Sequence, residues 1–171
     1  VMFMIHLGLA EASTIRAGNA WGVKNLEYLK KGAKVAASCS VLFSFIAMIF
    51  LITFGDMLVS FYVDIDDPAR DQIIYIGALL LIAAALFQFV DGGQAMALGL
   101  LRGIQDTTVP MLITILSYWL VGIPSAYFFA FVINWDSLGI WAGLGTGLGF
   151  AATLLGVRFI VLVNSDRKVT L

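Results

Sequence analysis

The sequence predicts an all-α, polytopic helical membrane protein with about five transmembrane helices. Hydrophobic residues make up 61% of the 171 residues and charged residues only 12%, whereas a soluble domain is nearer half apolar and a quarter charged. The apolar residues fall in long runs, and at roughly 20 residues per crossing plus loops this length accommodates about five spans. Lys and Arg gather in alternate polar segments, as they do on the cytoplasmic flanks of membrane proteins.

Several function classes do not fit this composition. The net charge of −1 offers no basic surface for nucleic acid. Cys39 is the only cysteine, so a disulfide within the chain is impossible and a metal cluster is not expected. One His and one Cys leave too few parts for a triad or a metal site, and no phosphate-binding glycine loop is visible. We therefore expect neither an enzyme nor a bound cofactor.

The N-terminal half predicts two spans joined by a basic segment. Residues 1–21 are apolar at first and become more polar toward the end. Residues 23–34 carry four lysines among apolar residues, which is typical of a short interfacial helix. Residues 35–54 are an uncharged span that we expect to end at Gly55–Asp56. The chain opens on Val1 without a polar lead-in or a cleavable signal, which is typical of a truncated chain.

The C-terminal half predicts three more spans. The acidic stretch 64–71 is a loop or short surface helix, and it is followed by a long crossing over 72–101. A polar turn precedes the fourth span, 110–133, in which Asp106 or Thr107 caps the helix and Pro124 predicts a kink. The fifth span covers 138–163, and residues 164–168 form a polar tail.

The distribution of charge predicts the orientation. Successive loops lie on alternate sides of the membrane, and this arrangement puts nine basic residues on or near one side. By the positive-inside rule this side is cytoplasmic, and the C-terminus lies on it. The nine residues are Arg16, Lys24, Lys30, Lys31, Lys34, Arg102, Arg158, Arg167 and Lys168. The opposite side carries Arg70 as its only basic residue, and its loops carry Asp56, Asp64, Asp66, Asp67, Asp71 and Asp136. We expect the cell (inner) membrane as the location.

Asp91 is the first candidate for function, because an ionisable side chain inside a span costs a few kcal/mol or more and is usually kept for an ion or proton pathway. Gln88 lies one turn before it and projects to an overlapping face, so the two residues could share a cation or a polar substrate group. The alternative is that Asp91 lies nearer the cytoplasmic end, or pairs with a distant Arg to hold helices together.

Glu11 is a second acidic candidate, with function and structure evenly balanced. It could contribute to a cavity, pair with Arg16, or extend to the membrane surface. His6 could titrate near neutral pH, but a lone histidine in an apolar run is more often packed and hydrogen-bonded, and this is the interpretation we favour.

The fifth span carries three glycines spaced by four residues. Gly139, Gly143 and Gly147 therefore lie on one face of a helix, where small residues let helices approach closely. We expect them to pack against another helix, although glycines that make the helix pliable would give the same pattern.

Three motifs carry a resemblance to a known family. They are Ser13-Thr14-Ile15-Arg16-Ala17-Gly18-Asn19-Ala20-Trp21-Gly22, Phe87-Gln88-Phe89-Val90-Asp91-Gly92-Gly93-Gln94, and Leu100-Leu101-Arg102-Gly103-Ile104-Gln105-Asp106-Thr107-Thr108-Val109-Pro110. In this order they resemble the second lobe of multidrug and toxic compound extrusion (MATE) transporters, with the NorM-type branch nearest. The similarity runs over essentially the whole chain.

This resemblance implies a fold and an activity. The family has twelve helices in two six-helix lobes, and residues 1–171 resemble the eighth to twelfth, so the first lobe and the seventh helix would be missing partners. An acid of the tenth helix contributes to the family's Na+ or H+ site, and it matches Asp91. Glu11 lies in the eighth-helix region but has no assured counterpart. The implied activity is antiport, in which inward movement of Na+ or H+ drives export of amphipathic, often cationic drugs and other xenobiotics.

Two alternatives remain open at this point. A lipid-linked oligosaccharide flippase has a related architecture, but its cavity would carry more cationic residues, and Arg102 at a loop is poorly placed for that. A non-transporting membrane assembly subunit is the alternative from a different class.

Overall fold

The computed structural model describes residues 2–169, and within them every regular element is helical. The helices are α1 (Met2–Gly22), α2 (Leu26–Ser60), α3 (Arg70–Gly103), α4 (Thr108–Leu116), α5 (Ile123–Tyr127) and α6 (Asp136–Val169). Two π-helical segments, η1 (Ser117–Gly122) and η2 (Phe128–Val132), join α4 to α5 and extend α5. The elements from α4 to η2 follow one another without a break, so the chain forms five rods.

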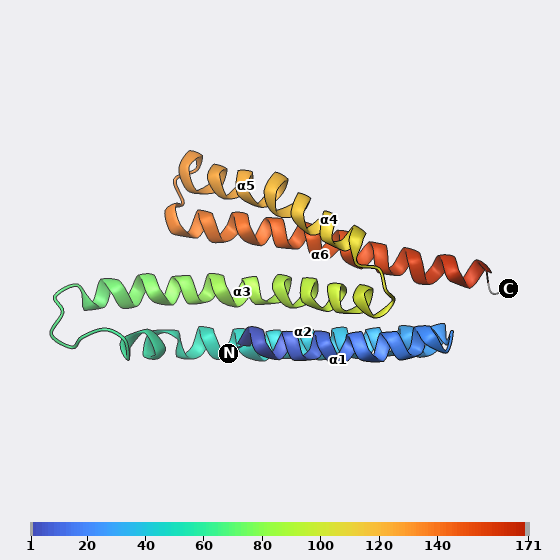
Figure 1. Ribbon diagram of the computed structural model, residues 1–171. Helices are drawn as coiled ribbons and strands as arrows, with labels where there is room; N and C mark the ends of the chain where they lie inside the picture. Colours follow the sequence, from blue (N-terminus) through green and yellow to red (C-terminus); the bar gives the residue numbers. More distant parts are fainter. Residues whose placement is uncertain (1, 170–171) are drawn as a thin grey trace.

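α3 is the central rod. α1 and α2 pack against one side of it, and α6 packs against another side with the α4–η2 rod on its far flank (Figure 1). The turn after α1, the turn after α3 and the C-terminal end of α6 lie at one end of the molecule (Figure 1). The loop 61–69 and the turn before α6 lie at the opposite end. The predicted gathering of basic and acidic residues at opposite ends is therefore confirmed for the parts of the chain that the structure describes.

Four rods are long and apolar enough to cross a membrane. They cover Leu26–Ser60, Arg70–Gly103, Thr108–Val132 and Asp136–Ser165. The all-helical, multi-pass membrane fold is thus confirmed. α1 has 21 residues but is not among the four, since Glu11, Arg16 and several small polar residues dilute its apolar character. The fifth crossing stays a prediction.

α2 differs most from the sequence-based expectation. The basic segment 23–34 was expected to be a separate short helix, but from Leu26 onward it forms the first turns of α2. The side chain of Asn25 caps this helix by accepting a hydrogen bond from the Tyr28 amide at 2.9 Å, and nothing in the following lysines breaks a helix. The expected end at Gly55–Asp56 is also wrong, because Gly55 is a packing residue facing Ala78 and Leu81 of α3 and α2 continues to Ser60.

The fourth rod accommodates Pro124 by widening its turns. Proline has no amide proton and its ring collides with the carbonyl four residues earlier. The preceding residues form the π-helical η1, after which the Ile123 amide bonds to the carbonyl of Tyr118, five residues back. π-turns of this kind are a recognised way of absorbing such a disruption.

The predicted cap of this rod is wrong. Thr107 occupies the cap position without a side-chain hydrogen bond. The carboxylate of Asp106 instead accepts a hydrogen bond from Arg158 Nε of α6 at 2.5 Å. α6 itself extends to Val169, so the expected polar tail after residue 163 is a continuation of the helix.

The glycine repeat of α6 packs as predicted. A Cβ atom at Gly139 would lie 2.5 Å from the Ala130 amide nitrogen, and one at Gly147 would lie 2.6 Å from the Gly122 Cα. A Cβ at Gly143 would collide with the backbone of Ala126. The three glycines therefore allow α6 to approach the backbone of the fourth rod closely.

Candidate functional site

Asp91 lies in the middle part of α3 and is half-buried. The next residue, Gly92, is buried against α1 and α2: a Cβ atom there would lie 2.6 Å from His6 Cε1 and 3.0 Å from Ser40 Oγ. Asp91 therefore directly precedes the residue at which α3 packs on α1 and α2. The carboxylate also lies within electrostatic range of the His6 ring.

His6 is completely buried, and both of its ring nitrogens face hydroxyl groups of α2. Nδ1 lies 3.0 Å from Ser40 Oγ and Nε2 lies 3.2 Å from Ser44 Oγ. In a neutral ring one nitrogen donates and the other accepts, so one serine accepts a hydrogen bond from the ring while the other donates to it. The ring edge packs on Phe43, with the centroids 5.2 Å apart. The interpretation of His6 as a packed, hydrogen-bonded residue is confirmed.

Polar side chains recur along α3 on either side of Asp91. Gln88, Asp91 and Gln94 are spaced by three residues, so Asp91 lies about 60° around the helix from each of the two glutamines. Gln94 is buried, and its Oε1 accepts a hydrogen bond from the Tyr118 hydroxyl at 2.7 Å. Gln88 Nε2 is buried and has no hydrogen-bond partner among the residues that the structure describes.

This row has the chemistry of a site for a small cation or a proton. Carboxylate, amide and hydroxyl oxygens are the ligands that hard cations prefer. Of the two amides, only the oxygens can ligate a cation; the unpartnered Gln88 Nε2 is a donor and would pair with an acceptor instead. Within the described part of the chain, no three His, Cys, Asp or Glu side chains cluster, and the row therefore offers a single carboxylate.

Glu11 does not join this row. Its Oε1 lies 3.3 Å from Arg102 Nη1, and both side chains are more than half exposed. The suggested partner, Arg16, instead lies over the Tyr28 ring, 4.8 Å from its centroid. Asp91 and Gln88 lie one turn apart on α3, and their joint role stays a prediction, while Glu11 pairs with Arg102 nearer the basic end of the molecule.

Sequence reasoning missed Tyr118 and the two serines as members of this region. Ser40 and Ser44 carried a usable signal, since they are spaced by four residues within the apolar part of α2 and so face the same way. Tyr118 carried none, because its partner Gln94 is 24 residues away in the chain.

Comparison with known proteins gives a consistent result. The family model MatE matches residues 1–128. The chain is 38% identical over 160 residues to a protein of Mesorhizobium japonicum named "Probable multidrug resistance protein NorM", covering 94% of this chain and 34% of that protein. The protein of the same name from Rhizobium meliloti is 37% identical over 164 residues, covering 96% and 35%. The chain therefore spans about a third of the length of these relatives.

Two solved structures share the fold. One is an inward-facing multidrug resistance MATE family transporter of the MOP superfamily, with a TM-score of 0.84 and 19% identity over 98% of this chain and 38% of that one. The other is the eukaryotic MATE transporter AtDTX14, with a TM-score of 0.79 and 18% identity over 99% and 38%. The helix order, the family model and the NorM relatives agree, and the chain belongs to the MatE family of multidrug and toxic compound extrusion transporters.

Proposed function

We propose that this chain forms most of the second lobe of a two-lobe antiporter, in which entry of Na+ or H+ drives export of amphipathic, often cationic compounds. The observation that carries the proposal is the single carboxylate of Asp91, half-buried in the long apolar helix α3. A carboxyl group withdrawn from water favours its protonated form, while an entering cation favours the charged form. One such group can exchange a proton or Na+ for cationic cargo, with no covalent catalysis.

A first lobe is a required partner in this proposal. Alternating access needs two bodies that rock against each other around a central site. The five rods described here supply one such body, so we expect the chain by itself to catalyse no ion-coupled flux in liposomes. Coexpression with a first-lobe protein should restore drug efflux, whereas inert oligomers would favour the assembly-subunit alternative.

The proposed location is the cell (inner) membrane, with the basic end of the bundle in the cytoplasm. Lys30, Lys31 and Lys34 lie on the first turns of α2 at that end, which supports a cytoplasmic C-terminus by the positive-inside rule. The flippase alternative gains no support from Arg102, because that side chain is exposed and paired with Glu11.

Substitution of Asp91 tests the proposal in the assembled transporter. Asp91→Asn keeps the size and most hydrogen bonding but removes the charge, so it should abolish ion-coupled efflux while expression and folding stay nearly intact. Asp56→Asn is a matched control, because it removes an exposed carboxylate near the far end of α2 and should leave efflux unchanged. Efflux in inverted vesicles is measured under imposed Na+ and H+ gradients.

Normal efflux by Asp91→Asn with a normal dependence on the ion gradient would contradict the assignment. Asp91 would then be a helix-packing residue, and Glu11 would be the next carboxylate to replace. Retention of partial coupling by Asp91→Glu would support the carboxylate itself as the coupling group.

A further inference from the structure

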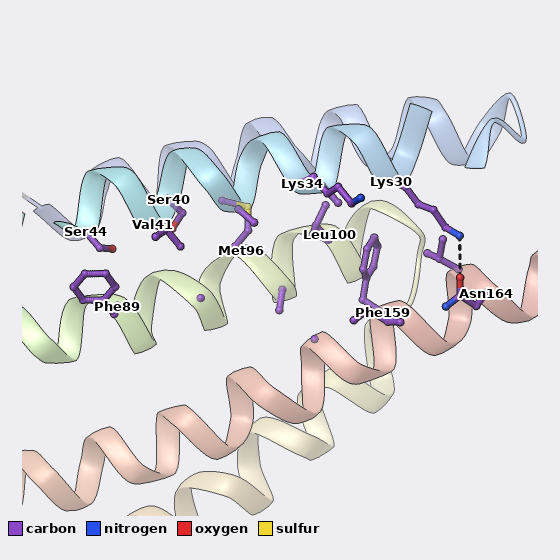
Figure 2. Close-up of a pocket in the computed structure, with 17 residues that line it drawn as sticks. Lys30, Lys34, Ser40, Val41, Ser44, Phe89, Met96, Leu100, Phe159 and Asn164 are labelled. Carbon is purple, nitrogen blue, oxygen red and sulfur yellow. Dashed lines mark hydrogen bonds between the residues drawn. The ribbon is translucent and has the colours of Figure 1, made fainter. Parts of the chain in front are cut away.

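A groove with a volume of about 500 Å³ lies between α2, α3 and α6 (Figure 2). Its walls are mostly apolar. The larger side chains that line it are Val41, Phe89, Met96, Leu100, Phe159 and Ile160. Its polar groups stand at the two ends: Lys30, Lys34 and Asn164 at one, and the serine hydroxyls of Ser40 and Ser44 toward the other (Figure 2).

The groove opens on the side of α3 opposite Asp91. Phe89 and Gly93 both line it, and Asp91 stands two residues from each. At about 100° per residue, two residues correspond to about 200° around a helix. The groove is therefore separate from the polar row, and its occupant would not compete with cargo or coupling ion at Asp91.

Two lysines stand at the mouth of the groove. Lys30 Nζ donates a hydrogen bond to Asn164 Oδ1 at 2.8 Å, which links α2 to α6 across the end of the groove (Figure 2). Lys34 is exposed and lines the same end. Neither lysine forms an ion pair with any side chain that the structure describes. An ammonium has three donors, so both cations keep donors for an anion.

The length of the groove matches one leaflet of a bilayer. Lys30 and Ser44 mark its ends on α2, and 14 residues of α-helix rise about 21 Å. One leaflet contributes about 15 Å of hydrocarbon, with the headgroup region beyond it. A molecule with an anionic head at the lysines would therefore have its tail alongside the apolar wall down to the middle of the membrane.

We propose that this groove binds an anionic phospholipid, with its phosphate at Lys30 and Lys34 and an acyl chain between α2 and α6. Basic residues next to a span attract anionic lipids electrostatically. The apolar side chains of the groove would contact the acyl chain of the lipid, which would fill the open space of the groove. A lipid seated there would fill the space between α2 and α6, the two rods that Lys30 and Asn164 already connect.

Two glycines keep the groove open and provide a way to close it. Gly93 and Gly156 both line it, and a Cβ atom built on Gly156 or Gly93 meets no atom within 4 Å. A leucine at either position would project into the groove without a collision at its Cβ. Gly8 of α1 is equally open but does not line the groove, so Gly8→Leu is a matched control.

Photolabelling of the whole chain tests the proposal. The chain is reconstituted into phosphatidylcholine vesicles that contain a small fraction of a photoactivatable lipid with a diazirine on its acyl chain. In one set of vesicles this probe is phosphatidylglycerol, and in the other it is phosphatidylcholine. After illumination, adducts are mapped by mass spectrometry. We expect phosphatidylglycerol adducts on the groove segments of α3 and α6, several-fold above those of phosphatidylcholine. The double substitution Lys30→Gln/Lys34→Gln should remove this preference, whereas Lys31→Gln, which lies at the same end but outside the groove, should retain it.

Substitutions that fill the groove distinguish a lipid bound in it from the lipids that surround the whole protein. Gly156→Leu should reduce groove adducts from both lipids, while Gly8→Leu should not. Gly93→Leu fills the same groove from α3 and replaces Gly156→Leu in this test if Gly156→Leu does not fold. Equal labelling by the two lipids in the unmodified chain would overturn the proposal. Adducts that survive both leucine substitutions, or crosslinks between two copies through the groove in place of lipid adducts, would also overturn it.

Discussion

Gly92→Ala adds one methyl group where α3 faces the buried His6 ring. The new Cβ would lie 2.6 Å from His6 Cε1, 2.7 Å from His6 Nδ1 and 3.0 Å from Ser40 Oγ. The ring has little room to retreat, because Phe43 packs on it and the two serines hold its nitrogens. The ring must therefore move away from its hydrogen bonds.

The size of the effect follows from these contacts. Overpacking a well-filled site costs about 1–3 kcal/mol, and hydrogen bonds between membrane helices contribute about 0.6 kcal/mol each on average. We therefore expect Gly92→Ala to lower the free energy of unfolding by about 2–4 kcal/mol. Unfolding is followed by circular dichroism during titration of detergent micelles with sodium dodecyl sulfate.

Gly93→Ala is the matched control, since the neighbouring glycine on the same helix has no atom within 4 Å of a built Cβ. Alanine there should be neutral or should stabilise the helix by up to about 1 kcal/mol. Truncating the ring with His6→Ala should make room for the methyl group, so the double variant His6→Ala/Gly92→Ala should be less destabilised than the two single effects added together. Equal stability of Gly92→Ala and Gly93→Ala would refute the described contact between α1 and α3.

Three further predictions concern packing, charge and orientation. Gly143→Ala should lower the free energy of unfolding by at least about 2 kcal/mol in the same titration, because its methyl group meets backbone rather than a movable side chain. A stability like that of the unmodified chain would contradict the tight approach of α6. Arg158→Gln leaves the largely buried carboxylate of Asp106 unpaired and should lower the free energy of unfolding by about 1–3 kcal/mol. Arg102→Gln removes an exposed ion pair and should lower it by no more than about 1 kcal/mol. The reverse order of the two effects would contradict the described burial. A cysteine replacing Lys31 in a cysteine-free background should react with a membrane-impermeant maleimide only in opened cells, and labelling in intact cells would reverse the proposed orientation.

Local patterns in the sequence predicted the features that depend on neighbouring residues. The third span was expected over 72–101 and is Arg70–Gly103, because an acidic loop and Arg102 mark its limits. The glycine repeat of α6 was predicted to pack, since a spacing of four fixes one helix face whatever lies opposite.

Features that depend on distant residues were not predictable from the sequence. The partner of Asp106 is 52 residues away, and nothing local distinguishes a capping carboxylate from one bound to another helix. The serines that hold His6 are 34 and 38 residues away. The length of α2 was underestimated because lysines suit a surface helix and a helix extending out of the membrane equally well. The role of Asp91 in coupling remains a prediction.

The close approach of α6 to the fourth rod also limits how the two can move. Their contacts pair Gly147 with Gly122, Gly143 with Ala126 and Gly139 with Ala130, so each step of four residues along one rod matches four along its antiparallel neighbour. A slide of one rod along the other by four residues would bring Tyr118 opposite Gly147 in one direction, or Asn134 opposite Gly139 in the other. Neither side chain fits where a Cβ atom already meets backbone, so we expect the two rods to move as one unit.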